Sequence, residues 1–164
     1  MKYHKIRKMD IANGPGVRVS VFLQGCAFHC KNCFNPETWD FDGGLEFDDS
    51  VIDEILSLCK DDYITGLSIL GGEPMHPKNI EGTTRLAKAF KKMYPNKNIW
   101  AWSGFLFDEA LKGKEVLQYL DVLVDGQFVE ELRNPNLKWR GSSNQRVIDV
   151  QKSLKKDTIV LFCE

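Results

Sequence analysis

Apolar and polar residues along this chain follow two periods. Short apolar runs of strand length recur, and the strands that they predict are Val17–Gly25, Gly66–Leu70, Asn98–Trp102 and Asp121–Val124. Between them lie stretches with apolar residues three and four positions apart. These stretches predict one helix that begins near Asp49 or Ser50 and another from about Ile80 to Tyr94. Strands that alternate with helices are typical of a parallel sheet with right-handed crossovers.

The remaining parts of the chain carry weaker patterns. Tyr3–Met9 alternates and predicts an edge strand or an arm folded over the core. Arg146–Val150 and Thr158–Phe162 predict short strands, and Phe107–Leu120 predicts one or two short helices broken around Gly113. A closed eight-stranded barrel takes about 250 residues, which is more than this chain has. We therefore expect one α/β domain, residues 1–164, in the form of an incomplete, laterally open barrel.

Composition narrows the class of protein. The 164 residues are 43% hydrophobic and 27% charged, as in a soluble globular protein. The net charge of −1 gives no sign of broad electrostatic binding to nucleic acid or to a membrane. No apolar run approaches the roughly 20 residues of a membrane span, and Met1–Lys5 lacks the apolar core of a signal peptide. We expect a cytoplasmic protein with reduced thiols, no nucleic-acid partner and no membrane association.

Three of the five cysteines fall within one short loop after the first strong strand. Cys26, Cys30 and Cys33 have the spacing Cys-x3-Cys-x2-Cys. Three thiolates can hold three irons of a 4Fe-4S cluster and leave the fourth iron open to a small molecule. The alternatives are a zinc site with His29, a disulfide, and plain core cysteines. The single short loop disfavours zinc, the odd cysteine count disfavours a disulfide, and the polar neighbours disfavour a core role.

Two further cysteines and one tryptophan lie outside this loop. Cys59 falls on the apolar stripe of the first predicted helix, so we expect it to pack in the core. Cys163 is too remote in sequence to assign to the cluster. Trp39 leaves the cysteine loop and is either a shield that keeps water from the cluster or an ordinary core aromatic.

A second motif, Gly71-Gly72-Glu73-Pro74, follows the next predicted strand. Two glycines let the backbone approach a ligand closely, and the proline fixes the direction in which the chain leaves. Backbone carbonyls and the Glu73 carboxylate could receive an ammonium group. Taken alone, the motif is equally an ordinary strand-to-loop turn. Both motifs end predicted strands, and parallel sheets place their sites at the carboxyl ends of strands.

Together the two motifs resemble those of the radical S-adenosylmethionine (SAM) enzymes. The stretches Asp10–Arg18, Asp121–Phe128 and Trp139–Arg146 narrow the resemblance to the activating proteins of the anaerobic (class III) ribonucleotide reductase, over nearly the whole chain. The stretch Arg140–Gln145 points to this family rather than to other glycyl-radical activases. One departure is Asn32, because the superfamily often has an aromatic residue before the last cysteine.

The resemblance implies a radical SAM oxidoreductase with an incomplete, laterally open (β/α) barrel. Flavodoxin or ferredoxin would pass one electron to a 4Fe-4S cluster held by Cys26, Cys30 and Cys33. The cluster would cleave SAM reductively, and the resulting 5′-deoxyadenosyl radical would take a hydrogen atom from a glycine in the large subunit of the anaerobic ribonucleotide reductase.

The resemblance also implies contacts for SAM and for the reductase. The candidate cofactor-binding residues are Asn32, Cys33, Phe34, Gly71, Gly72, Glu73, Ser103 and Asp125. The glycine turn would receive the methionyl end of SAM, and backbone groups around Asn32 and Phe34 would face the adenine. Ser103 and Asp125 would contact the ammonium or ribose, or else merely cap their strands. The candidate partner-binding residues are Trp139, Arg140, Asn144 and Gln145.

Other functions remain open at this point. An activase of the formate-lyase type is usually longer and lacks the stretch Trp139–Gln145. A radical SAM carboxy-deazaguanine synthase is a different class of enzyme, and no feature of the sequence favours it. A non-catalytic iron–sulfur electron carrier would need a fourth cysteine and would have no use for Gly71–Pro74. A zinc-binding module is the other non-catalytic alternative.

Overall fold

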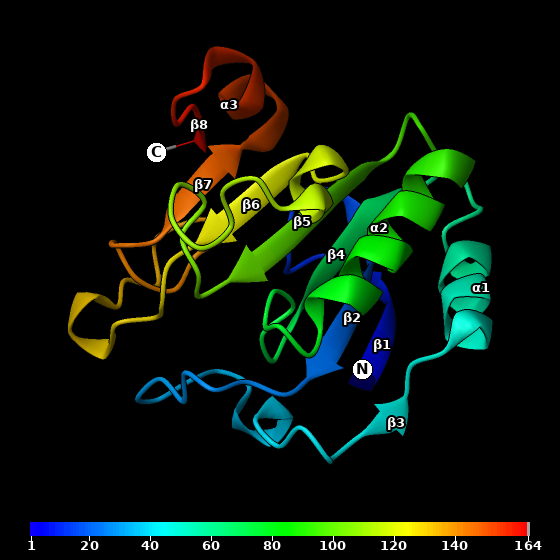
Figure 1. Cartoon of the computed structure of the whole chain (residues 1–164), viewed down its shortest axis with the longest axis horizontal. Helices are drawn as coiled ribbons and strands as arrows, with labels where there is room; N and C mark the ends of the chain where they lie inside the picture. The colour runs from blue at the N-terminus through cyan, green and yellow to red at the C-terminus, as the bar shows by residue number, and fades with distance from the viewer. Residues whose placement is uncertain (164) are drawn as a thin grey trace.

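Eight strands form one open mixed sheet in the computed structural model, which describes residues 1–163 (Figure 1). The strands are β1 (Lys2–Asp10), β2 (Val17–Gln24), β3 (Leu45–Glu46), β4 (Ile64–Gly71), β5 (Asn98–Ser103), β6 (Val122–Asp125), β7 (Arg146–Asp149) and β8 (Leu161–Cys163). Their order across the sheet is β3-β1-β2-β4-β5-β6-β7-β8. The four central strands β2, β4, β5 and β6 are parallel, whereas β1, β3, β7 and β8 pair in antiparallel fashion.

The predicted incomplete, laterally open (β/α) barrel is wrong. The chain instead makes one mixed sheet with antiparallel strands toward both edges. Three α-helices are present in residues 1–163, namely α1 (Asp49–Leu58), α2 (Ile80–Met93) and α3 (Val150–Lys156). Only two of them, α1 and α2, cross over between parallel strands. The connection from β5 to β6 holds turns and the 3-10 helix η2 (Glu115–Gln118) in place of the expected short helices.

The antiparallel edges follow from short connections. Residues 11–16 join β1 to β2, and such a length cannot carry the crossover that a parallel pair needs. β1 therefore pairs with β2 as an antiparallel neighbour, and β3 covers part of its outer side. The strands predicted at Val17–Gly25, Gly66–Leu70 and Asn98–Trp102 are confirmed to within two residues at each end. The pattern of apolar residues did not predict β3 or α3.

The helices α1 and α2 lie on one face of the sheet and bury the main core against it (Figure 1). Wholly buried residues of this core include Leu23, Leu67, Ile69, Ile99, Ile55, Leu86 and Phe90. Asp48 caps α1, since its carboxylate accepts hydrogen bonds from the N–H groups of Ser50 and Val51. Cys59 is wholly buried in the same core, as predicted, and burial raises the pKa of its thiol to about 12.

Successive side chains of a strand point to opposite faces of the sheet, so every second residue of these strands points away from the main core. Arg18 of β2 is wholly buried there, and its guanidinium donates to the Ser68 hydroxyl (2.7 Å) and to the Leu67 carbonyl (2.9 Å) of β4. It also donates to the Pro15 carbonyl at 3.1 Å, which holds the 11–16 connection against this face. Burial lowers the pKa of Arg18 to about 10. Trp100 of β5 packs beside it, with the guanidinium 5.9 Å from its ring.

None of the helices in residues 1–163 combines the length and the apolar character that a membrane span requires.

Candidate functional site

A cavity of about 550 Å³ lies at the carboxyl ends of the parallel strands. The arrows of β2, β5 and β6 in Figure 1 point toward the cysteine loop and toward the segment that follows β6. All three motif cysteines line the cavity, and so do the turn residues Gly71, Gly72 and Glu73. Because parallel strands end at the same edge of a sheet, two motifs that are far apart in the chain meet here.

The cysteine loop leaves β2 with its thiols only partly exposed. The Cys26 N–H donates to the Trp39 carbonyl (3.1 Å), and the Cys33 N–H donates to the Cys30 carbonyl (3.1 Å). All five cysteines of the chain are free thiols. Burial raises the pKa of Cys26, while hydrogen bonds from the N–H groups of Phe28 and His29 oppose the rise. Burial likewise raises the pKa of Cys30.

The donor set fits a multinuclear cluster better than a single metal ion. Across residues 1–163, His, Cys, Asp and Glu side chains form no group of three that could hold one ion. Zinc needs its ligands to converge on one point, whereas a 4Fe-4S cluster takes each thiolate on a different iron. His29, the alternative zinc ligand, instead stacks on Trp39 with ring centroids 4.4 Å apart.

The two glycines of the turn bring the two motifs into contact. The Gly72 N–H donates to the Leu23 carbonyl (2.8 Å), and the Glu73 N–H donates to the Gly25 carbonyl (2.7 Å). A Cβ on Gly72 would stand 2.5 Å from the Gly25 oxygen, and Gly71 has a φ of +105°. The backbone approach that glycine permits here is therefore toward the start of the cysteine loop.

Asn79 is a site-forming residue that sequence reasoning missed. It is 1% exposed and precedes α2, yet its side chain makes no capping hydrogen bond. Its amide nitrogen instead donates to the carbonyls of Gln24 (3.1 Å) and Glu73 (3.0 Å), so it ties the two motifs together. An asparagine before a helix is the ordinary signal for a cap, and that signal concealed the bridging role.

The Glu73 carboxylate is only 2% exposed and is already engaged by the protein. It accepts hydrogen bonds from the Ser103 hydroxyl (2.7 Å), the Gly104 N–H (2.6 Å) and the Met75 N–H (2.9 Å). Burial raises the pKa of Glu73 to about 7, against the opposing effect of these three donors. Glu73 and Ser103 thus line the cavity together and join the ends of β4 and β5.

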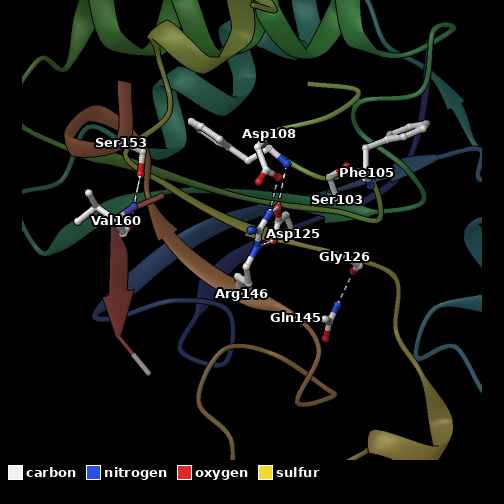
Figure 2. Close-up of polar contacts among 10 residues, drawn as sticks. Ser103, Phe105, Asp108, Asp125, Gly126, Gln145, Arg146, Ser153 and Val160 are labelled. Atoms are coloured by element: carbon white, nitrogen blue, oxygen red, sulfur yellow. Dashed lines mark hydrogen bonds and ion pairs between the residues drawn. The ribbon is translucent and has the colours of Figure 1, made fainter. Parts of the chain in front are cut away.

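Asp125, a candidate SAM contact, lies outside the cavity wall. Figure 2 shows the Arg146 side chain between Asp125 and Asp108. Arg146 donates to Asp125 at 2.6 Å and to Asp108 at 2.9 Å, and the Asp125 hydrogen bond raises the pKa of Arg146. Asp125 also accepts the Phe107 N–H at 2.8 Å, so it joins β6 to β7 and to the chain after β5.

The segment 126–145 folds over the cysteine loop. The Phe34 and Phe128 rings lie 5.0 Å apart, and the Arg133 guanidinium stands 5.7 Å from the Phe34 ring. The Gln127 side-chain oxygen lies 4.0 Å from the Cys30 sulfur. This segment therefore makes one wall of the cavity, to which the candidate Phe34 also contributes. Asn32, by contrast, sits in an exposed turn with a φ of +57° and does not line the cavity.

The stretch Arg140–Gln145 holds this wall together from within. The Gln145 side-chain oxygen accepts the N–H groups of Gly141 (2.9 Å) and Ser142 (3.1 Å). Its side-chain nitrogen donates to the Gly126 carbonyl (2.9 Å), as drawn in Figure 2. Arg140 donates to the Gln145 carbonyl at 2.5 Å.

The other two partner-binding candidates also make internal contacts. The Asn144 amide donates to the Gln127 carbonyl at 2.8 Å, and Asn144 does not line the cavity. The Trp139 carbonyl accepts the Trp102 indole N–H at 2.7 Å, and the Trp139 ring packs edge-on against Trp100. Trp139, Arg140 and Gln145 all contribute to the cavity wall.

Comparison with known proteins agrees with this site. A family model described as a 4Fe-4S single cluster domain matches residues 12–148. The chain is 41% identical over 148 residues to the anaerobic ribonucleoside-triphosphate reductase-activating protein of Vibrio cholerae, covering 88% of this chain and 96% of that protein. The proteins of the same name from Escherichia coli K12 and Enterobacteria phage T4 are each 40% identical, over 150 and 147 residues. Those matches cover 90% of this chain in both cases, and 97% and 93% of the relatives.

The fold places three free cysteines on one cavity, the cluster family model spans most of the chain, and the relatives align over nearly their whole length. The chain therefore belongs to the family of anaerobic ribonucleoside-triphosphate reductase-activating proteins, whose 4Fe-4S single cluster domain it carries.

Proposed function

We propose that this protein activates an anaerobic ribonucleoside-triphosphate reductase by generating a glycyl radical on it, with SAM as cosubstrate. The observation that carries the proposal is the single cavity that three free cysteines share with the Gly71–Gly72 turn. The names of the relatives support the reductase as partner, and the family model supports the 4Fe-4S cluster.

Cys26, Cys30 and Cys33 are the residues that hold the cluster in this proposal. When bound, the cluster would supply the electron for reductive cleavage of SAM, and the radical released from SAM would take a hydrogen atom from a glycine of the reductase. Backbone N–H groups at Cys26 favour the thiolate form, since they donate to the sulfur. Burial nevertheless raises the pKa of Cys26 and of Cys30, so both side chains are thiols before the cluster is bound. Binding of the cluster must therefore release their protons.

The contacts to SAM follow from which groups are still available. The Glu73 carboxylate and the Ser103 hydroxyl bind each other, so they shape the site instead of reaching freely into it. The backbone carbonyls of Gly71 and Gly72 are the better candidates for the methionyl end, because the Gly72 N–H already donates to the Leu23 carbonyl. The Phe34 ring is 59% exposed and lines the cavity, which suits it to face the adenine.

In this proposal the reductase docks on the exposed tip of the segment 126–145. Its bonded residues, Arg140 and Gln145 among them, fix the wall, while the 3-10 helix η3 (Glu130–Leu132) projects with Leu132 44% exposed. In this proposal Trp139, Arg140, Asn144 and Gln145 shape the docking surface, and the tip makes the contact. Flavodoxin or ferredoxin remains the proposed electron donor, by resemblance to the family.

One experiment separates this function from a plain electron carrier. The protein is reconstituted anaerobically with iron and sulfide, reduced with dithionite, and examined by EPR with and without SAM. We expect SAM to change the signal of the reduced cluster, and the added reductase to gain a glycyl radical signal. A cluster signal that ignores SAM, with no methionine released, would leave only the carrier.

A further inference from the structure

The first strand concentrates positive charge near one edge of the sheet. The whole chain has a net charge of −1, yet residues 2–8 contain no carboxylate and four lysine or arginine side chains, namely Lys2, Lys5, Arg7 and Lys8. In the sheet, β3 pairs with the first two residues of β1 alone. Among residues 1–163, no other strand covers the outer side of β1, and Lys5, Arg7 and Lys8 are exposed. We call these three residues the basic edge.

The basic edge is continuous with the cavity. The Lys5 nitrogen lies 4.9 Å from the centroid of the Phe22 ring, and the Arg7 guanidinium lies 5.2 Å from the same centroid. Phe22 and Arg7 both line the cavity. Lysine on an edge strand often serves only to prevent pairing with another chain. That role does not require the charges to lie against the cavity of the cysteine loop, so their position indicates a further role.

Positive charge also predominates in the cavity wall. Its basic residues are Arg7, Arg133 and Arg140, and its one acidic residue in the described part of the chain is Glu73. Glu73 is buried and bonded to three donors of the protein, and burial raises its pKa to about 7. The Arg7 guanidinium lies 3.7 Å from the Asp10 carboxylate, but neither Arg133 nor Arg140 makes an ion pair with any residue that the structure describes. The wall therefore favours an anionic ligand.

The ligands of the proposed function do not account for the charge on β1. SAM carries an ammonium and a sulfonium group against one carboxylate, so its own net charge is positive. The cluster is anionic with three thiolates, but it would sit at the cysteine loop, which follows Gln24 of β2. Arg7 pairs in register with Ser20, and Lys8 lies still farther along β1. The basic edge thus runs away from the cysteine loop, and its partner is a different anionic group.

We propose that the basic edge binds an acidic segment of the reductase and that this contact orients the reductase over the cavity. The reductase is the occupant because, in the proposed function on which this inference rests, its glycine must reach the cavity that Arg7 and Phe22 line. The reductase therefore covers the surface next to the basic edge. Facing surfaces of opposite charge speed association and fix orientation. The contact is separate from that of Leu132 at the tip of the segment 126–145.

Charge reversal at Lys5 and Lys8 tests the contact, since neither residue lines the cavity. Lys5→Glu combined with Lys8→Glu should weaken binding of the reductase about tenfold in an anaerobic titration at low salt. The loss should shrink at high salt, because mobile ions screen exposed charges. Lys5→Arg with Lys8→Arg keeps the charge and should keep the parent affinity. The matched control, Lys60→Glu with Lys88→Glu, makes the same change in net charge at exposed residues outside the cavity and should also bind as the parent does.

A cross-linking measurement identifies the chemistry of the partner group. A water-soluble carbodiimide joins a lysine amine to a carboxylate without a spacer, so it reports pairs in direct contact. In the complex of the parent protein with the reductase, mass spectrometry should find Lys5 or Lys8 joined to Asp or Glu residues of one reductase segment. The variant with arginine at both positions should lose these cross-links while it keeps the affinity. This result does not depend on whether the glutamate variant folds.

Three outcomes would overturn the inference. The first is an affinity for the reductase that charge reversal leaves unchanged. The second is an equal loss in the control at Lys60 and Lys88, because overall charge would then steer the reductase. The third is a loss of iron content, or of the SAM-dependent change in the EPR signal, in the glutamate variant at Lys5 and Lys8, because the basic edge would then support the SAM site. Failure of the proposed function looks different: the cluster of the parent protein would not respond to SAM at all.

Discussion

The Ser103 hydroxyl donates a 2.7 Å hydrogen bond to the Glu73 carboxylate, so two residues expected to contact SAM contact each other. The bond spans the ends of β4 and β5, and the Gly104 N–H reinforces it at 2.6 Å. A buried carboxylate with three donors is a means of fixing the distance between two strand ends. The width of the cavity at this point is therefore set by the protein before any ligand enters.

This pair makes stability depend on pH in a defined direction. Burial raises the pKa of Glu73 from its ordinary 4.5 to about 7, so the folded state binds the proton more tightly than the unfolded chain does. The contribution of Glu73 to the free energy of unfolding is at its full value below pH 4.5 and falls as the pH rises to about 7. The slope is at most about 1.4 kcal/mol per pH unit.

Glu73→Gln stays neutral and should remove that pH dependence. Urea unfolding of both proteins without SAM, at several pH values from 5 to 8, measures it. The parent should lose stability relative to the variant as the pH rises. Parallel curves for the two proteins would mean that Glu73 titrates as it does in the unfolded chain.

The glycine turn gives a second prediction. We expect Gly72→Ala to lower both the iron content and the affinity for SAM, because its Cβ would stand 2.5 Å from the Gly25 oxygen, one residue before Cys26. The control is Gly82→Ala, since Gly82 lies on α2 away from the cavity and the atoms nearest its Cβ would belong to the flexible Met1 side chain. Iron analysis and anaerobic equilibrium dialysis measure the two effects. Normal iron content with weak SAM binding would instead mean that the glycine makes room for the ligand alone.

The sequence predicts those parts of the site that depend on local patterns of residues, and it does not predict contacts between residues that are far apart in the chain. The apolar runs predict the parallel strands because buried strands of such a sheet are apolar on both faces. The meeting of the cysteine loop with the Gly71–Pro74 turn follows, since both end neighbouring parallel strands. The bond between Glu73 and Ser103, and the bridge made by Asn79, join residues whose pairing no local pattern encodes.

The barrel expectation failed for a related reason. Whether a row of parallel strands closes into a barrel or remains open depends on the strands at its two edges. The edge strands of this sheet have only weak patterns of apolar residues, so the sequence did not reveal their direction. The 11–16 connection forces β1 to run antiparallel, and β7 pairs antiparallel with β6. The short helix α3 (Val150–Lys156) went unpredicted because only two of its residues, Val150 and Ser153, are buried, too few for a helical stripe.

The cysteines give a third prediction. Changing any one of Cys26, Cys30 or Cys33 to alanine should abolish the cluster absorbance and SAM cleavage. Cys163→Ala should keep both, because Cys163 lies on β8 and does not line the cavity. Cys59→Ala should keep the cluster and lower the free energy of unfolding by about 1 kcal/mol, since it removes buried core volume. If Cys163→Ala lost the absorbance as fully as Cys30→Ala, the three-ligand assignment would be wrong.

The last prediction separates docking of the reductase from support of the cavity wall. Leu132 is 44% exposed at the tip of the segment 126–145, and its side chain does not line the cavity. Replacing an apolar side chain that packs in an interface lowers the binding free energy, and each loss of about 1.4 kcal/mol weakens the affinity about tenfold. Leu132→Asp should therefore lower the glycyl-radical yield about tenfold at limiting reductase. It should leave dithionite-driven SAM cleavage without the reductase near the parent rate.

Gln145→Ala is the contrasting variant, because the Gln145 side chain bonds Gly141, Ser142 and Gly126 inside the same segment. Its removal leaves backbone N–H groups unpaired and should destabilise the wall by about 1–3 kcal/mol. Both SAM cleavage and radical yield should then fall together, and Arg140→Ala should behave in the same way, since it removes the bond to the Gln145 carbonyl. Measuring both activities in one anaerobic preparation gives the comparison. An equal fall of the two activities in Leu132→Asp would show that the tip supports the SAM site, and the docking role would have to be assigned to another surface.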